Sequence, residues 1–132
     1  MTFYEKEIRR ISSKIYANQG QIDTVIETRN YIDNNYASDL NLDLLSELNF
    51  VSKFHLLRLF KKYYGQTPKQ YLTDKRVEKS KEFLAEGMAI TETCFAVGFN
   101  SLGSFSSWFK QKTGLSPLDF QKRASLKKQL KS

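Results

Sequence analysis

The chain has 132 residues, 40% of them hydrophobic, and a formal net charge of +7. This length allows one compact domain or two very small ones, and a composition rich in Leu, Phe, Tyr and Lys but poor in Pro and Gly favours helices. The single cysteine, Cys94, excludes an internal disulfide framework. No apolar run approaches the roughly 18 residues of a membrane span. The charged N-terminal stretch does not resemble a secretory signal, so we expect a soluble cytoplasmic protein.

Positive charge is concentrated in two segments of the chain. Residues 49–75 carry six Lys or Arg against one acid, and residues 101–132 carry seven against one. Residues 21–48, in contrast, carry one Arg against six acids. Two basic segments indicate an anionic partner, with a basic but inert surface as the alternative.

The first predicted element lies within residues 1–20. Its apolar residues fall at helical spacings of 4, 3 and 4 and are Tyr4, Ile8, Ile11 and Ile15. This pattern predicts an amphipathic helix ending near Asn18-Gln19-Gly20. The helix has three possible roles: it packs on the domain, pairs with a partner or is the remnant of a linker.

Two further helices are predicted before residue 50. The stretch IDTVIETRNYIDNNY is helical in pattern, and Thr24 with Glu27 forms a possible capping box at its start. Asn41 is a possible N-cap for the short helix LDLLSEL. We expect this short helix to end at Asn49, a residue that tolerates the left-handed conformation.

The next part of the chain is repeated. FVSKFHLLRLFKKYYGQTP, residues 50–68, aligns without a gap with FNSLGSFSSWFKQKTGLSP, residues 99–117. The alignment pairs six identical residues: Phe50/Phe99, Ser52/Ser101, Phe60/Phe109, Lys61/Lys110, Gly65/Gly114 and Pro68/Pro117. An internal repeat of this kind indicates that one structural unit occurs twice.

Each copy is predicted to be a turn followed by a helix with a defined start and end. Ser52 and Ser101 are expected N-caps, and Gly65 and Gly114 are expected left-handed residues that end the helices. The Thr67-Pro68 and Ser116-Pro117 pairs then begin new helices. The core stripes are predicted to be Leu56, Leu59, Phe60 and Tyr63 in the first copy, and Leu102, Phe105, Trp108 and Phe109 in the second.

A short helix precedes the second copy as well, capped by Thr91 and ending at Gly98. Short helix, tight turn and longer helix form the helix-turn-helix pattern, here present twice in an all-α fold of about seven helices. The predicted segments are an N-terminal helix or linker (1–20), a first helix-turn-helix (21–67), a connecting helix (68–87) and a second helix-turn-helix with a basic tail (88–132).

The connecting helix explains why two units occur in one chain. From Pro68 to about Glu86 it is about 27–28 Å long. Successive major grooves on one face of DNA lie about 34 Å apart. A rod of this length holds two reading heads about one turn apart, so the pattern predicts an asymmetric site bound by a monomer.

The face of the first recognition helix that is left after the core stripe is removed is chemically varied. Arg58 suits guanine O6 and N7, Lys61 suits a phosphate, and Phe54 and Leu57 suit thymine methyl groups. The alternative for Phe54 and Leu57 is an extended core. The predicted DNA-binding residues of this helix are Ser52, Lys53, Phe54, Leu57, Arg58 and Lys61.

The corresponding face of the second copy consists of small residues. Such a helix fits closely against DNA, and serine hydroxyls bond bases or phosphates with little selectivity, so we expect position and affinity more than sequence reading. The alternative is a mainly structural copy. The predicted DNA-binding residues here are Ser101, Leu102, Gly103, Ser104, Ser106, Ser107 and Lys110.

These motifs resemble a known family. The segments LLSELNFVSKFHLLRLFKKYYGQTPKQYL and ITETCFAVGFNSLGSFSSWFKQKTGLSPLDFQKR are similar to the two helix-turn-helix motifs of the AraC/XylS family of bacterial transcription regulators. The resemblance covers about residues 22–124. It implies seven helices, the third and sixth of them in adjacent major grooves, and RNA polymerase as a partner. It also places Phe54, Leu57, Arg58, Leu102, Gly103, Ser106 and Ser107 at base-reading positions.

The chain departs from the family pattern at three positions. Ser46 and Cys94 stand where the family often has Ala, which indicates a small buried residue in each case. Ser107 stands where many members carry Arg, which argues against strong base reading by the second copy.

The function predicted from the sequence is therefore a sequence-specific DNA-binding transcription regulator, favoured over the alternative of a helical adaptor for an acidic protein or RNA. We expect an activator, nucleoid-associated, with no catalytic residues, metal or cofactor. The lone His55 and buried-type Cys94 have no catalytic neighbours. Dimerisation through residues 1–20 is an alternative to the monomer, and the chain is either a stand-alone regulator or part of a longer protein.

Overall fold

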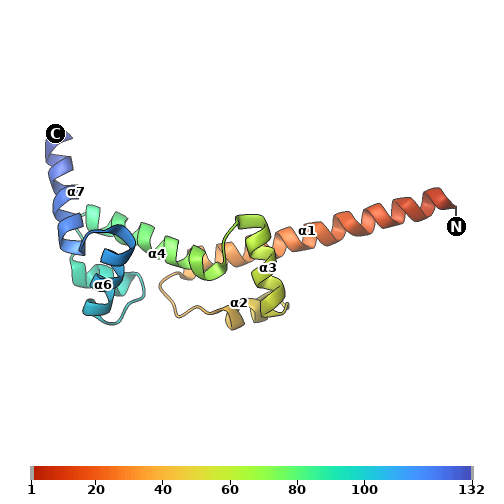
Figure 1. The fold of residues 1–132 in the computed structure, drawn as a ribbon, viewed down its shortest axis with the longest axis horizontal. Helices are drawn as coiled ribbons and strands as arrows, with labels where there is room; N and C mark the ends of the chain where they lie inside the picture. The colour runs from red at the N-terminus through yellow and green to blue at the C-terminus, as the bar shows by residue number, and fades with distance from the viewer. Residues whose placement is uncertain (1, 132) are drawn as a thin grey trace. The chain divides into compact units, whose positions relative to one another are not determined.

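The computed structural model describes residues 2–131; Met1 and Ser132, the end residues of the first and last predicted segments, lie outside the described part. Residues 2–131 form seven helices and no strand (Figure 1), which confirms the all-α prediction. The helices are α1 (Phe3–Asn35), α2 (Leu42–Leu48), α3 (Lys53–Tyr64), α4 (Pro68–Ala85), α5 (Ile90–Ala96), α6 (Leu102–Thr113) and α7 (Pro117–Lys131). In this part of the chain, no helix has both the length and the apolar character required to cross a bilayer.

The chain divides into two compact units. Unit 1 contains the residues up to Ile32 together with Asn41–Lys69, and unit 2 contains Asp33–Leu40 together with the residues from Gln70 onward. Unit 1 therefore holds most of α1 with α2 and α3, and unit 2 holds most of α4 with α5, α6 and α7.

Helix α1 is continuous across Asn18-Gln19-Gly20, where the sequence predicted an end. The cost of one glycine inside a helix is only about 1 kcal/mol, and bonds between successive turns hold this region together. Gln19 Nε2 donates to Asp23 Oδ1 at 3.0 Å. The predicted capping box is wrong as well, because Thr24 lies inside the helix and its hydroxyl donates to the Gly20 carbonyl at 3.0 Å.

The core of unit 1 is mainly aliphatic, with one fully buried aromatic ring, Phe60. Its buried side chains come from α1, α2 and α3 and are Val25, Ile32, Leu45, Leu56, Leu59 and Phe60. The buried Thr28 hydroxyl donates to the Thr24 carbonyl at 2.8 Å and accepts from Asn49 Nδ2 at 3.1 Å. This contact fixes the end of α2 against α1.

The core of unit 2 is aromatic. Phe105 and Phe109 are fully buried with Leu84, Cys94 and Val97, and further rings pack around them: Tyr36, Phe83, Phe99, Trp108 and Phe120. The ring centroids of Phe99 and Trp108 are 4.8 Å apart, and those of Phe109 and Phe120 are 5.5 Å apart. Rings at these separations contribute beyond their buried area, so α6 is held in place mainly by aromatic contacts.

Arg76 of α4 anchors the segment that follows α1 in unit 2. Its Nε donates to the Tyr36 carbonyl at 2.7 Å, and Nη2 donates to the Ser38 carbonyl at 2.9 Å. Burial lowers the pKa of the guanidinium and the nearby Asp39 opposes this shift. Arg76 therefore has a structural role, because its donors are used inside the protein.

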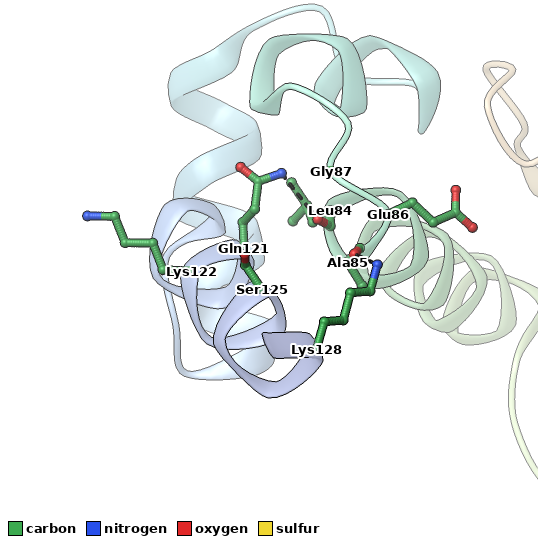
Figure 2. Close-up of a pocket in the computed structure, with 8 residues that line it drawn as sticks. All are labelled: Leu84, Ala85, Glu86, Gly87, Gln121, Lys122, Ser125 and Lys128. Carbon is green, nitrogen blue, oxygen red and sulfur yellow. Dashed lines mark hydrogen bonds between the residues drawn. The ribbon is translucent and has the colours of Figure 1, made fainter. Parts of the chain in front are cut away.

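Helix α7 packs against the end of α4 through polar contacts (Figure 2). Gln121 Nε2 donates to the Leu84 carbonyl at 3.1 Å and to the Met88 carbonyl at 2.7 Å, and Lys128 Nζ donates to the Ala85 carbonyl. The Leu84 and Ala85 carbonyls lie at the C-terminus of α4, where such donors and a positive charge are favourable. The hollow at this junction has a volume of about 450 Å³ and is lined by Leu84, Ala85, Glu86, Gly87, Gln121, Lys122, Ser125 and Lys128.

Most predicted helix ends are confirmed. Asn41, Ser52 and Ser101 accept from the backbone N–H groups of Leu44, His55 and Ser104, and Gly65 and Gly114 are left-handed residues after α3 and α6. Helices α4 and α7 begin at Pro68 and Pro117 as predicted. Gly98 is left-handed as expected for the residue that follows the end of α5.

Two predicted helix ends are wrong. Helix α5 begins at Ile90, before Thr91, and no side chain caps it. After α2 the left-handed residue is Phe50, with φ 55°, and not Asn49, whose φ is −103°. Asn49 instead uses its side chain inside unit 1, where Nδ2 donates to the Leu45 carbonyl at 2.8 Å.

Candidate nucleic-acid interface

Helix α3 divides into a core side and a solvent side. Leu56, Leu59 and Phe60 are buried, which confirms this part of the predicted stripe, whereas Tyr63 is exposed at its end. The predicted DNA-binding residues lie on the solvent side: Ser52, Lys53, Phe54, Arg58 and Lys61 are exposed and Leu57 is half-buried. Leu57 thus borders the core, whereas Phe54 is 68% exposed and is not part of it.

The cations of α3 differ in their protein partners. Lys53 Nζ lies 3.8 Å from Asp43 Oδ1 and 5.6 Å from the centre of the Phe54 ring. Within residues 2–131, neither Arg58 nor Lys61 takes part in a salt bridge. Arg58 and Lys61, like Lys62 in the last turn, are therefore α3 side chains whose charge is available for an external anion.

Helix α6 presents a flatter solvent side in unit 2. Phe105 and Phe109 are buried and Trp108 is half-buried, but Leu102 is 44% exposed and does not belong to the core stripe that the sequence predicted. Leu102 is instead the first residue of the helix, one position after the Ser101 cap. The remaining predicted residues of this face are exposed Gly103, Ser104, Ser107 and Lys110 and half-buried Ser106.

Gly103 lies on the open side of α6. A Cβ built at this position would meet no atom closer than the Ser101 Oγ at 4.0 Å. The packing of unit 2 therefore does not require glycine here, and glycine lowers helix stability by about 1 kcal/mol relative to alanine. Close approach of the helix backbone to an external molecule is a use of glycine that fits this position.

The two helix-turn-helix turns differ in length by one residue. Residues 49–52 join α2 to α3, and residues 97–101 join α5 to α6. Both short helices end with the same kind of backbone hydrogen bond, in which an N–H donates to the carbonyl five residues earlier. Val51 N donates to the Ser46 carbonyl at 3.1 Å, and Phe99 N donates to the Cys94 carbonyl at 3.0 Å. Phe50 therefore corresponds in structure to Gly98, and Val51 corresponds to Phe99.

This difference shows that Phe50 and Phe99, the first pair of the gapless repeat alignment, are not structurally equivalent. It also identifies Phe50 as a candidate interface residue that the alignment did not indicate. Phe99 is packed in the aromatic core, whereas Phe50 is 97% exposed. Phe50 lies in the turn before α3, and the exposed Phe54 lies in the first turn of that helix. The sequence signal was that the first turn, residues 49–52, contains no glycine. A residue with a side chain must therefore adopt the left-handed conformation there.

The His, Cys, Asp and Glu side chains of residues 2–131 indicate neither a metal site nor a reactive thiol. In the described part of the chain, no group of three or more His, Cys, Asp or Glu side chains is arranged to hold a metal ion. Cys94 is buried in unit 2, and burial raises the pKa of its thiol. A buried thiol with a raised pKa is a poor nucleophile, as expected for the small core residue that the sequence predicted.

Comparisons with known proteins agree with the helix-turn-helix geometry. A family model described as a helix-turn-helix domain matches residues 45–123. An uncharacterized HTH-type transcriptional regulator in the cgkA 5′ region of Pseudoalteromonas carrageenovora is 34% identical over 95 residues, which are 72% of this chain and 57% of that protein. The bifunctional transcriptional activator/DNA repair enzyme AdaA of Bacillus subtilis (strain 168) is 33% identical over 97 residues, 73% of this chain and 46% of that protein. The chain thus spans about half the length of these relatives.

Solved structures give the same result. The C-terminal domain of AraT, a response regulator from Geobacillus stearothermophilus, matches with a TM-score of 0.72 and 31% identity over 76% of this chain and 84% of that one. The DNA-binding domain of AdpA, a global transcriptional factor in complex with a target DNA, shares the fold with a TM-score of 0.72 and 19% identity over 78% of this chain and 94% of that one. The chain belongs to the AraC-type helix-turn-helix family of DNA-binding transcription regulators.

Proposed function

We propose that this chain binds double-stranded DNA sequence-specifically by placing α3 and α6 in adjacent major grooves. Residues 21–67 and 88–132 supply the two heads, and residues 68–87 connect them. The observation that carries the proposal is the same in both units: a capped recognition helix has one buried side and one solvent side with a free cation. This is the division that a helix needs to pack on its own domain and enter a groove at the same time.

The two heads have unequal roles in this proposal. On α3, Arg58 reads a guanine, Lys61 binds a phosphate and Phe54 contacts a thymine methyl. Leu57 borders this contact, Ser52 offers its hydroxyl at the helix start, and Lys53 is partly neutralised by Asp43. The first head therefore supplies most of the sequence preference.

The second head supplies affinity and position. Its solvent side offers hydroxyl groups, one glycine and Lys110, and no Arg, Asn or Gln reaches from the predicted residues of α6 toward a base. Hydroxyl groups bond either bases or phosphates, so they discriminate little between sequences. The residues assigned to this role are Ser101, Leu102, Gly103, Ser104, Ser106, Ser107 and Lys110.

The wider role that we propose is transcription activation with RNA polymerase as the protein partner. The support is the name of one relative, AdaA, which includes transcriptional activator. That name also includes a DNA repair enzyme, but this chain covers only 46% of that protein. We assign no enzymatic role and no cofactor to residues 2–131 and place the protein on the nucleoid in the cytoplasm, where its DNA lies.

Selection of bound sequences from a random duplex library tests the proposal directly. The purified chain is mixed with the library at two salt concentrations, and bound duplexes are sequenced. We expect an asymmetric motif over about two helical turns, with one half richer in information, and binding that weakens steeply with salt because phosphate contacts release counterions. Bound sequences without enrichment at either salt concentration would favour the helical adaptor for an acidic protein or RNA.

A further inference from the structure

Phe50 combines two properties that are each unfavourable for a side chain without a binding role. Its ring is 97% exposed, and its backbone is left-handed with φ of 55°. Among residues 2–131 it is the only residue other than glycine with a positive φ. A Cβ is crowded in this conformation, and an exposed ring leaves apolar surface in water. Residues under such strain are concentrated at binding sites.

The fold of unit 1 explains the left-handed position but not the ring. The turn is closed by main-chain bonds, from Phe50 N to the Glu47 carbonyl at 3.2 Å and from Val51 N to the Ser46 carbonyl at 3.1 Å. Glycine would form these bonds equally well, as Gly98 shows at the equivalent position of the second unit. The aromatic side chain therefore adds strain to this turn without adding contacts to the core.

The place of Phe50 in the chain puts its ring at the end of α3 that enters DNA in the proposed function. Val51 and the Ser52 cap follow Phe50, and α3 begins at Lys53. A recognition helix contacts base edges mainly with the residues of its N-terminal end. A residue just before this end therefore lies at the edge of the same groove.

A second exposed ring lies on the other side of the cap. Phe54 is in the first turn of α3 and is 68% exposed, and Lys53 Nζ lies 5.6 Å from the centre of its ring. One residue separates each ring from Ser52 in the sequence. The start of α3 thus offers two apolar groups, whereas Arg58 further along the helix offers a cation.

The apolar group that DNA presents in its major groove is the 5-methyl group of thymine. We propose that Phe50 contacts a thymine methyl group at the edge of the site read by α3, next to the base pairs that Phe54 and Arg58 contact. This inference rests on the proposed placement of α3 in the major groove. It makes the turn before α3, in addition to the helix itself, a determinant of sequence preference.

The two units differ in this respect. The residue equivalent to Phe50 in unit 2 is Gly98, which has no side chain to offer to a base. The turn before α6 therefore adds no thymine contact. We expect a thymine preference due to the turn at the outer edge of one half of the selected motif and not in the other half.

Selection from the random duplex library with the parent chain and Phe50→Asn is the first test. Asparagine tolerates the left-handed conformation, so this variant removes the ring and keeps the turn. We expect the variant to lose the thymine preference at one edge position and to keep the rest of the motif. A parent chain that selects no motif would contradict the proposed function. A parent and a variant that select the same motif with equal affinity would overturn the contact of Phe50 alone.

Removal of single methyl groups from the DNA identifies the group that Phe50 contacts. Each thymine of the selected duplex is replaced in turn by deoxyuridine, which lacks only the methyl group, and the affinity is measured by fluorescence anisotropy. At one edge position, deoxyuridine should lower the affinity of the parent about fourfold, as expected for one buried methyl group. The same replacement should leave the affinity of Phe50→Asn unchanged, because the two changes remove one contact. Equal losses for both proteins at every thymine would refute the proposal.

Two further variants separate the ring of Phe50 from general effects of removing an aromatic residue. Phe50→Tyr keeps the ring and should keep the thymine preference. Tyr16→Asn removes a ring of α1 that is also exposed, and its motif and affinity should equal those of the parent. Circular dichroism and urea unfolding confirm that each variant is folded. A loss of affinity in Tyr16→Asn as large as that in Phe50→Asn would contradict a specific role of Phe50.

Discussion

Phe50 and Gly98 occupy equivalent positions in the two helix-turn-helix units, the residue after the C-cap of the short helix, and both are left-handed with φ of 55° and 97°. Glycine adopts this conformation without steric cost, whereas a side chain with Cβ is strained there. The first unit therefore carries a strained aromatic residue that is almost fully exposed. Because the ring is not used in the core, its most direct use is contact with a bound molecule.

Phe50→Gly should make the protein more stable and less able to bind DNA. Relief of the left-handed strain is worth about 1 kcal/mol, and little buried area is lost with an exposed ring. Urea unfolding measures the stability, and titration of the selected duplex measures the affinity. A variant that gains stability and keeps full affinity would show that the Phe50 ring does not contact DNA.

Gly98→Ala should destabilise unit 2 more than Gly87→Ala does. Both glycines have positive φ, but a Cβ at Gly98 would stand 2.7 Å from the Ala37 carbonyl oxygen, whereas a Cβ at Gly87 meets nothing within 4 Å. We expect a cost of about 1 kcal/mol for Gly87→Ala from the left-handed backbone alone, and at least about 1 kcal/mol more for Gly98→Ala. Equal unfolding midpoints of the two variants in urea would disprove the close contact.

Gly103→Ala should separate stability from DNA binding in the second head. The helix gains about 1 kcal/mol because alanine replaces an unhindered glycine. A methyl group on the solvent side of α6 would at the same time keep the helix away from a groove, so we expect a lower affinity for the selected duplex. Ser107→Ala is the comparison on the same face, since it removes a hydroxyl proposed to contact DNA without adding bulk.

Arg58→Ala and Lys61→Ala should have different effects on specificity. Loss of a bidentate contact to guanine costs about 1–3 kcal/mol on the selected sequence and relaxes preference at one base pair. Loss of a phosphate contact weakens binding to all sequences alike and reduces the salt slope by about one. Binding of both variants to selected and scrambled duplexes at several salt concentrations distinguishes the two roles. An equal loss on both duplexes for Arg58→Ala would remove its assignment to a base.

The Cys94 thiol should lower stability only at alkaline pH. Burial raises its pKa in the folded protein, so the unfolded chain loses this proton first as the pH rises. The contribution of the thiol is thus constant below its ordinary pKa of about 8.5, and stability falls above it, by at most about 1.4 kcal/mol per pH unit. Urea unfolding of the parent and Cys94→Ala between neutral and alkaline pH measures the contribution of thiol ionisation to the free energy of unfolding. The difference between the two proteins should shrink above the ordinary pKa of the thiol.

The sequence predicted those parts of the fold that depend on local chemistry. A serine cap, an apolar stripe and a glycine stop are each read over a few residues, so α3 and α6 were predicted with their correct starts and ends. The continuity of α1 could not be predicted in the same way, because Asn18-Gln19-Gly20 is a favourable place to end a helix. The structure instead continues the helix through it, with the interior bonds of Gln19 and Thr24.

The candidate site was predicted by assigning to DNA binding those residues of each recognition helix that do not belong to its core stripe. The assignment agrees with the burial in the structure wherever the core stripe was predicted correctly. It misplaced Leu102 in the core, because the first residue of a helix follows the periodicity without being covered by a neighbour. It missed Phe50, because the gapless alignment paired this residue with buried Phe99. The one-residue difference between the turns becomes visible only when the backbone bonds to Ser46 and Cys94 are compared.

The unequal cores of the two units have a practical consequence for studies of this protein. The only tryptophan, Trp108, is packed beside Phe99 and Phe105 in unit 2, and unit 1 contains none. Its fluorescence therefore reports the melting of unit 2 alone, while circular dichroism follows the helices of both. Coincident transitions would show that the two units unfold as one cooperative body, and separate ones would show independent folding. Trp108 is thus a built-in optical probe of how strongly the unfolding of unit 2 is coupled to that of unit 1.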